Sequence, residues 1–389
     1  MLLVGARQVG KSTLIKHEFK DFNRANFDDR LTRMQAKEEP KLFLLNNPQP
    51  LFIDEVQKES SILEDIKQIV DESDERGMFL LSGSQKLELM KGMSESLAGR
   101  VSISELTGLS MREIYGVKFN RHFIPTDAYI KEREKEIVKY DNIWEIIHKG
   151  SYPELYDIDR DWQEYYSSYV ATYLERDINE LVAADGITFT KFLTAVAART
   201  GELLNYSNIA GDVGVSEPTI KNWISILERT GIVYLLQPYS ASALKRAIKT
   251  PKLYFRDTGL ACYLTRWLTA ETLKCSAVAG NMFETFVVSE ILKSYSNEGK
   301  DYRFNIFYYR GKDRNASGEN EIDLVIEEDG VLYPVEIKMS GNPKASMGAT
   351  NQVLDKVSDK KRGLGVILCL IDKKTYLREN LVALPIEFI

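Results

Sequence analysis

The first nineteen residues restrict the fold of this chain more than any other stretch. A short apolar run, "MLLV", leads into Gly5-x-x-x-x-Gly10-Lys11-Ser12, and apolar residues at helical spacing follow. This strand–turn–helix setting is typical of a P-loop. Its glycines let backbone N–H groups close around phosphate oxygens, and the start of the helix adds a favourable dipole. The sequence therefore predicts a nucleotide-binding α/β domain at the N-terminus.

The pattern also predicts a role for each polar residue of the loop. Lys11 is expected to reach the β- and γ-phosphates, and the Ser12 hydroxyl to ligate Mg²⁺. We expect ATP and Mg²⁺ as cofactors. The residues predicted to contact them are Gly5, Gln8, Val9, Gly10, Lys11, Ser12, Thr13, Asp54 and Ser84.

Two further strands end in polar residues. "PLFIDEVQ" ends at Asp54 and Glu55, and "MFLLSGS" ends at Ser84. The carboxyl ends of strands in a doubly wound sheet are where ligands bind. Asp54 is predicted to hold Mg²⁺ through water, Glu55 to polarise the attacking water, and Ser84 to sense the γ-phosphate. Arg100, in "SLAGRV", is a candidate arginine finger or sensor, and the alternative is an ordinary surface residue with no catalytic role.

These motifs together resemble those of the AAA-type ATPases of bacteria and archaea that carry a C-terminal domain of unknown function. GxRQVGKST, FIDEVQ, LSGSQ and LAGR carry the resemblance, and matching motifs extend to about Lys338. The resemblance implies an ATPase fold and gives no substrate. Such proteins normally have an upstream segment that closes over the adenine. Because the P-loop strand begins at Met1 here, we expect weak nucleotide affinity.

The middle of the chain predicts helices followed by a winged helix. "NYSNIAGDVGVSEPTIKNWISILERTGIVYLL" has the pattern of a helix-turn-helix, with Gly214 at the turn and Ser216 capping the second helix. A basic loop follows, and its cations suit a phosphate backbone. Those cations are Lys245, Arg246, Lys249, Lys252 and Arg256. Non-specific DNA contact and protein contact both remain open for this region.

The stretch "EIDLVIEEDGVLYPVEIK" predicts a hairpin that turns at Asp329-Gly330. Its apolar residues alternate, so one face is expected to be buried and the other wet. The polar face carries Asp323 on the first arm, with Glu336 and Lys338 on the second. Such charges are common on exposed hairpins, so the pattern alone does not separate a catalytic site from an ordinary wet face.

The order of elements around the hairpin resembles the restriction-endonuclease-like PD-(D/E)XK core. The resemblance implies that Asp323 and Glu336 ligate Mg²⁺ and that Lys338 positions or deprotonates the attacking water. Glu284, on the apolar stripe of the preceding helix, is the candidate third carboxylate. Nuclease activity stays undecided at this stage.

Composition narrows the class of protein. The net charge of −6 argues against a wholly cationic nucleic-acid coat, although a local basic patch fits. The three cysteines and three histidines lack metal-ligand spacing, and no apolar run approaches the ~18 residues of a membrane span. We expect a cytoplasmic protein that has no membrane partner, and whether copies associate as a homo-oligomer is left open.

The sequence thus predicts an α/β protein of several parts. The expected divisions are 1–105 for the AAA-type core, 106–184 for a helical lid and linker, 185–262 for a winged helix and 263–389 for a restriction-endonuclease-like domain. The favoured function is an ATPase that couples its nucleotide state to DNA engagement. The alternatives are a Mg²⁺-dependent nuclease licensed by ATP, and a non-catalytic nucleotide-gated scaffold that binds protein through its winged helix.

Overall fold

The computed structural model describes residues 1–83, 97, 99–157, 160–178, 185–240, 249–312, 319–357 and 359–389. The chain divides into two compact units. The first contains residues 1–108 together with Arg229–Ile232, and the second contains 109–228 and 233–389. Each unit is described by itself. In the described ranges, no helix is both long and apolar enough to cross a bilayer.

The first unit is built on a parallel sheet in the order β2-β3-β4-β1-β5. Its strands are β1 (Leu2–Val4), β2 (Asn23–Asn26), β3 (Leu51–Asp54), β4 (Phe79–Gly83) and β5 (Ile103–Glu105). Its helices are α1 (Lys11–Glu18), α2 (Arg30–Glu38), α3 (Pro40–Asn46), η1 (Val56–Glu59) and α4 (Ile62–Asp71). Strand β4 pairs with both β1 and β3, so it lies between the P-loop strand and the strand that ends at Asp54.

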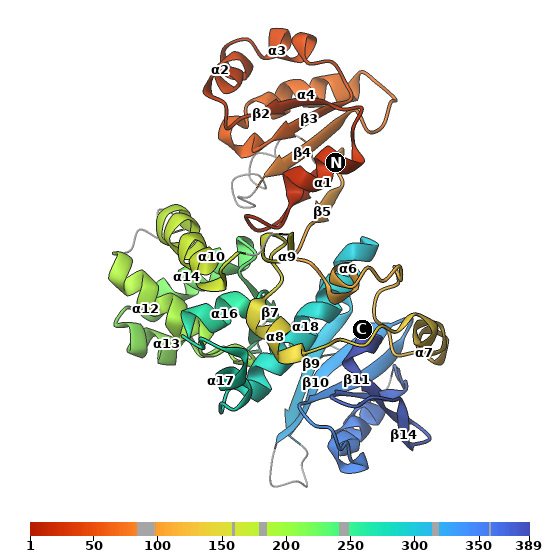
Figure 1. Cartoon of the computed structure of the whole chain (residues 1–389). Helices are drawn as coiled ribbons and strands as arrows, with labels where there is room; N and C mark the ends of the chain where they lie inside the picture. The colour runs from red at the N-terminus through yellow and green to blue at the C-terminus, as the bar shows by residue number, and fades with distance from the viewer. Residues whose placement is uncertain are drawn as a thin grey trace. The chain divides into compact units, whose positions relative to one another are not determined.

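Alternate residues of the strands face two separate cores, which makes this unit a three-layer sandwich (Figure 1). One face, with Leu2 and Ile53, packs against α2, α3 and α4. The other face, with Leu3 and Phe52, packs against Ile15 of α1. Because both faces are covered, strands β1, β3 and β4 are almost wholly apolar, as in other buried parallel sheets, whereas the edge strands β2 and β5 carry polar residues.

The second unit begins with short helices and then a compact helix–strand region. The first group contains α6 (Met111–Ile114), α7 (Asp127–Arg133), η2 (Glu134–Glu136), α8 (Ile143–Lys149), α9 (Glu154–Asp157), α10 (Trp162–Tyr169) and η3 (Val170–Ile178). The second group contains α12 (Gly186–Ala197), β6 (Glu202–Leu203), α13 (Tyr206–Val213), α14 (Glu217–Arg229), β7 (Val233–Leu236) and β8 (Lys252–Phe255).

The predicted helix-turn-helix is confirmed at α13 and α14. Gly214 ends α13 in a left-handed conformation (φ 89°), and the Ser216 hydroxyl accepts a hydrogen bond from the Thr219 amide (3.3 Å). Trp223 and Leu227 lie on the buried face of α14. Strands β6, β8 and β7 form a small antiparallel sheet in that spatial order beside these helices.

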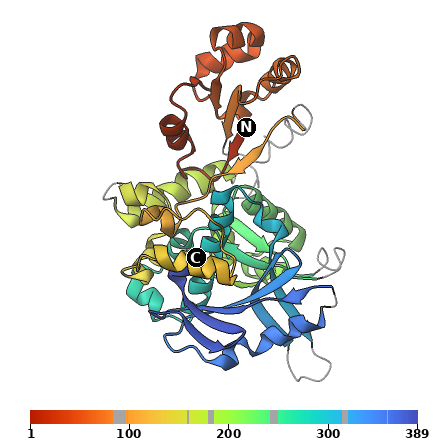
Figure 2. The ribbon, with the colours of Figure 1, turned by 90° about the vertical axis from the view of Figure 1, so that its right-hand side faces the viewer.

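The rest of the second unit is a mixed sheet in the order β14-β15-β13-β11-β10-β9. Its strands are β9 (Ile306–Lys312), β10 (Glu319–Glu328), β11 (Val331–Lys338), β12 (Lys361–Arg362), β13 (Gly365–Cys369), β14 (Thr375–Arg378) and β15 (Leu381–Pro385). The helices of this part are α16 (Thr258–Leu264), α17 (Ala270–Lys274), α18 (Ala279–Glu298), η4 (Tyr302–Phe304), η5 (Ala345–Lys356) and η6 (Ile386–Phe388). The strands lie side by side in the second view (Figure 2).

The predicted hairpin is confirmed, but its wet face is not. Strands β10 and β11 pair antiparallel with Leu324 opposite Val335 and turn at Asp329-Gly330, where both residues have positive φ. The prediction of an exposed polar face was wrong, because Asp323 is only 8% exposed and Glu336 only 3%. The sheet is covered on both faces, so the central residues of these strands are buried on both sides, and the strand ends are partly exposed.

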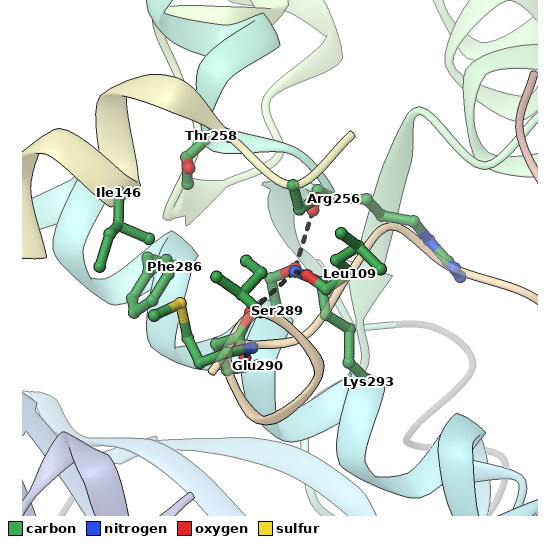
Figure 3. Close-up of a pocket in the computed structure, with 12 residues that line it drawn as sticks. Leu109, Ile146, Arg256, Thr258, Phe286, Ser289, Glu290 and Lys293 are labelled. Atoms are coloured by element: carbon green, nitrogen blue, oxygen red, sulfur yellow. Dashed lines mark hydrogen bonds and ion pairs between the residues drawn. The ribbon is translucent and has the colours of Figure 1, made fainter. Parts of the chain in front are cut away.

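Helix α18 is buried along most of its length, and the segment that enters the second unit is fixed to it (Figures 1 and 3). Glu290 accepts a hydrogen bond from the Met111 amide (2.8 Å). Lys293 donates to the carbonyl of Leu109 (3.0 Å) and to Glu290 (2.7 Å). Both charged side chains are 5% exposed. The cavity beside them measures about 10 Å³, so it has room for one water molecule at most.

We predict that Glu290→Ala lowers the free energy of unfolding by roughly 3–5 kcal/mol, because it leaves the Lys293 ammonium buried without its carboxylate. Urea unfolding followed by circular dichroism measures the change. Asp372→Ala is the matched control, since Asp372 pairs with Lys139 at the surface (2.6 Å) and its side chain is 78% exposed. The control is expected to unfold like the parent protein. Equal loss in both variants would contradict the role given to the buried pair.

Candidate functional site

The P-loop has the backbone shape that its sequence predicts. Gly10 (φ 93°) and Gln8 (φ 63°) adopt left-handed conformations, and α1 begins at Lys11 without a side-chain cap. A Cβ atom at Gly5 would lie 2.2 Å from the carbonyl oxygen of Leu106, so only glycine fits there. The uncapped N–H groups at the start of α1 point to an anion as their missing partner.

Lys11 is buried within the loop. Its ammonium group donates to the carbonyls of Ala6 (2.8 Å) and Gly5 (3.0 Å), and the residue is 7% exposed. Burial lowers its pKa to about 8, although the charges of Glu55 and Asp54 act in the opposite direction. A lysine held in this way gains a strong partner when a polyphosphate enters the loop.

The polar ends of three elements meet at Asp54. The Ser12 hydroxyl donates to Asp54 Oδ2 (2.7 Å), and the Ser82 hydroxyl donates to Asp54 Oδ1. A hydroxyl and a carboxylate oxygen brought together at the start of α1 are donors suited to Mg²⁺. The chemistry of these residues therefore fits Mg²⁺ bound together with a nucleotide.

Glu55 lies next to this cluster in a strained conformation. Its φ of 54° and ψ of 43° are uncommon for a residue other than glycine. Its amide donates to Asp54 Oδ1 (3.2 Å), and its carboxylate accepts a hydrogen bond from Gln57. Backbone strain of this kind is frequent at functional sites, where the surrounding structure fixes it.

The remaining residues predicted for the nucleotide site have different outcomes. Val9 is buried, whereas Gln8 and Thr13 are exposed. Ser84 lies outside the described residues. Arg100 forms an ion pair with Asp71, the last residue of α4 (3.1 Å from Nη2 to Oδ2), and its role as an arginine finger stays a prediction.

In the second unit, Asp323, Glu336 and Lys338 lie together at the predicted hairpin. The Lys338 ammonium is 2.8 Å from Asp323 Oδ2 and 2.9 Å from Glu336 Oε2. Asp323 Oδ2 also accepts a hydrogen bond from the amide of Ile337 (2.8 Å). Burial, followed by the charge of Asp323, raises the pKa of Glu336 to about 8. The lysine therefore acts as the cation between these two carboxylates.

Glu284, the predicted third carboxylate, has partners of its own. Its Oε1 atom accepts hydrogen bonds from the Tyr254 hydroxyl (2.6 Å) and from the Lys252 ammonium (3.1 Å). Burial, followed by the charge of Asp323, raises the pKa of Glu284.

Asp323, Glu336 and Glu284 do not fit a metal as they lie. Among the described residues, no three His, Cys, Asp or Glu side chains form a group that could hold a metal ion. Oε1 of Glu336 is the buried oxygen of this set without a hydrogen-bond partner in the described part of the chain. One such atom is well short of the oxygen ligands that Mg²⁺ or Ca²⁺ takes.

The cations of the basic loop have different outcomes. Lys245 and Arg246 belong to the residues that the structure does not describe, and Lys249 is exposed. Lys252 is buried against carboxylates, and Arg256 donates to the Tyr302 hydroxyl. The expectation that Lys252 contacts a phosphate backbone was therefore wrong, because its acidic partners, Glu284 and Glu321, come from distant parts of the sequence.

Comparison with known protein families assigns three regions. Residues 1–115 match the family described as AAA domain. Residues 140–271 match one domain of unknown function (DUF8612), and residues 279–389 match another (DUF4143). The N-terminal region is thus an AAA-type P-loop domain in an α/β protein.

The relatives and solved structures name no function for the chain. It is 27% identical over 362 residues to an uncharacterized protein of Mycobacterium bovis and to one of Mycobacterium tuberculosis, covering 91% of this chain and 74% of each relative. The Aeropyrum pernix ORC2 protein in its ADP form matches with a TM-score of 0.28 at 14% identity, over 76% of this chain and 88% of that one. Protein VC1899 from Vibrio cholerae matches with a TM-score of 0.19 at 12% identity, over 98% and 93%. TM-scores this low do not support any assignment of fold or function.

Two residues at these sites, Ser82 and Glu321, were given no role from the sequence, and a third, Lys252, was given a different one. The sequence prediction chose Ser84 in "MFLLSGS" and gave no role to Ser82, which lies within β4. Glu321 lies two residues before Asp323 on β10, and the alternation of the strand could have placed the two carboxylates on one face. Lys252 gave no such signal, because its partners are fixed by tertiary packing.

We predict that ATP affinity falls as pH rises through 8. In the nucleotide-free protein Lys11 loses its proton near pH 8, whereas bound phosphates favour the ammonium form. Binding above pH 8 must therefore take up a proton, and the dissociation constant is expected to rise by up to about tenfold per pH unit. Calorimetric titrations at pH 7, 8 and 9 measure it.

The control for this titration is Lys11→Arg, since a guanidinium group keeps its charge over the whole range. Its affinity is expected to be independent of pH between 7 and 9. A wild-type dissociation constant that is the same at pH 7 and pH 9 would show that Lys11 stays charged in the free protein.

Proposed function

We propose that this protein binds ATP with Mg²⁺ at its N-terminal P-loop, hydrolyses it, and uses the nucleotide state to change how residues 109–389 engage a partner. The convergence of Lys11, Ser12 and Asp54 at the start of α1 carries this proposal. The match of residues 1–115 to the AAA domain family supports it independently.

Each residue of the site has a task that its position supports. Lys11 and the amides at the start of α1 hold the phosphates. Ser12 and Asp54 would hold Mg²⁺, which neutralises charge on the phosphate oxygens when it is bound. Glu55, fixed by its strained backbone and by Gln57, orients a water molecule and accepts its proton. Ser82 keeps the Asp54 carboxylate in place by its hydrogen bond to Oδ1.

The route to the second unit is the chain itself. Leu106 lies at Gly5, where its carbonyl leaves no space for a side chain. Three residues later, Leu109 is bonded to Lys293 of α18, and Met111 to Glu290. A shift of the P-loop therefore reaches α18 through a segment that is fixed at both ends. This short, anchored connection is our basis for nucleotide-dependent change in the second unit.

DNA is the partner that we favour, through the winged helix predicted for residues 185–262. The strand order β6-β8-β7 beside α12, α13 and α14 supports this fold. On α14, however, Lys221 is paired with Glu217 (2.8 Å), so that helix offers little for reading bases. The expected contact is therefore to the phosphate backbone, from the basic loop. The scaffold alternative assigns the same region to protein contact.

Metal-dependent cleavage of DNA is the weaker alternative. Asp323 and Glu336 already contact Lys338, and Glu284 contacts Lys252. No nuclease step is therefore assigned to them.

We predict that Lys11→Ala abolishes ATP binding, because it removes the charge that faces the phosphates. Glu55→Gln is expected to keep binding and to slow turnover by on the order of a hundredfold or more, as general-base removal does. Nucleotide binding and phosphate release, measured on the same preparations, test the two roles. If the Glu55 variant hydrolyses ATP as fast as wild type, Glu55 takes no part in the reaction.

We also predict non-specific DNA affinity that weakens steeply with salt. Replacing Lys245, Arg246 and Lys249 together by alanine is expected to reduce the slope of log affinity against log salt by roughly three, about one released counterion per lost contact. Lys139→Ala, at an exposed lysine between η2 and α8, is the control and is expected to keep the slope. A slope that the triple variant leaves unchanged would favour the protein-contact role.

A further inference from the structure

The ammonium group of Lys252 lies among carboxylates that come from two other elements. Lys252 is the first residue of β8, the central strand of the small sheet, and pairs with Leu236 on β7 and Leu203 on β6. Its Nζ atom is 2.6 Å from Glu321 Oε1 on β10 and 3.1 Å from Glu284 Oε1 on α18. The side chain is only 5% exposed.

The surroundings of this ammonium group resemble a small cation cage. The ring of Tyr308 lies beside it, with 5.9 Å from Nζ to the ring centroid. Burial acts to lower the pKa of Lys252, but the charges of Glu284, Asp323 and Glu321 raise it above its ordinary value. Lysine is rarely buried unless it is paired, and here the pairing is with several acids at once.

A second ammonium group completes the neutralisation on the neighbouring strands. Lys338 contacts Asp323 and Glu336, so each carboxylate of this cluster, three on the sheet and Glu284 on α18, has a lysine within 3.1 Å. The positive charge that a divalent ion would bring to these acids is thus already supplied by side chains. This accounts for the misfit between the predicted metal ligands and a metal.

We propose that Lys252 is the built-in counter-ion of this carboxylate cluster, standing where a divalent metal would otherwise bind, and that it locks strand β8 to helix α18 and strand β10. The lock joins the region that carries the helix-turn-helix to the C-terminal sheet. If so, the intact protein needs no metal ion at Asp323. Removal of the Lys252 ammonium group would leave the carboxylates without this counter-ion, and they would then bind a divalent metal ion.

The test uses the full chain with Lys11→Ala and no nucleotide, so that the P-loop binds no metal–nucleotide complex. Melting temperatures are measured with and without millimolar Mn²⁺, and bound Mn²⁺ is counted by electron paramagnetic resonance. We expect the Lys11→Ala parent to melt alike in both conditions and to bind no Mn²⁺ at this cluster. Adding Lys252→Ala is expected to lower the melting temperature by roughly 6–10 °C, a loss that Mn²⁺ partly reverses.

A double variant distinguishes the effect of the Lys252 charge from the packing of its side-chain stem, and a surface variant serves as the control. Lys252→Met with Glu284→Gln removes both charges and keeps the volume, so it is expected to be more stable than Lys252→Ala and indifferent to Mn²⁺. Lys249→Ala, at an exposed lysine just before β8, is expected to melt like the parent. If Lys252→Ala does not fold, the parent and the double variant still decide the matter.

Three results would overturn the proposal. The first is Mn²⁺ binding or stabilisation in the Lys11→Ala parent that Asp323→Asn cancels, which would mean that a metal belongs at the cluster. The second is a Lys252→Ala variant as stable as the parent. The third is a double variant no more stable than Lys252→Ala, or failing to fold, which would assign the effect to packing.

Discussion

The second unit depends on the pairing of charges along helix α18. Nearly the whole helix is buried, so each of its charged side chains needs a partner from another part of the chain. Glu284 is bonded to Lys252 of β8, and the Glu290–Lys293 pair binds the backbone of Leu109 and Met111. The same requirement thus fixes both the strand that follows the helix-turn-helix and the segment that enters from the AAA-type domain. Apolar burial stabilises the unit, whereas these pairs decide which segments lie on the helix.

In the first unit, the corresponding constraint is backbone space around the phosphates. Gly5 approaches the carbonyl of Leu106 too closely for any side chain, and Gly10 has a left-handed conformation at the start of α1. Strand β4 lies between β1 and β3, and it brings the Ser82 hydroxyl to Asp54. One parallel sheet therefore holds both the P-loop and the strand that ends at Asp54. The strained backbone conformation is that of Glu55, the residue directly after this strand.

Local sequence pattern predicted much of this structure. The P-loop, the helix-turn-helix and the hairpin are all set by short-range features, such as glycines at left-handed positions and apolar periodicity, and all three are present. Contacts between distant segments could not be predicted. The alternation in the hairpin indicated one wet face, but coverage from both sides buries Asp323 and Glu336. Lys252 looked like a phosphate contact in a basic loop, because nothing local shows that Glu284 and Glu321 lie beside it.

If the proposed function holds, the nucleotide state of the P-loop reaches α18 through the anchored segment 109–113. Hydrogen–deuterium exchange with and without Mg²⁺ and a non-hydrolysable ATP analogue tests it most directly, with Lys11→Ala as the control that binds no nucleotide. We expect the analogue to change amide exchange in residues 109–113 and in α18 of the wild type. Exchange in the Lys11→Ala variant is expected to stay the same with and without the analogue. Changes confined to residues 1–108 would contradict it.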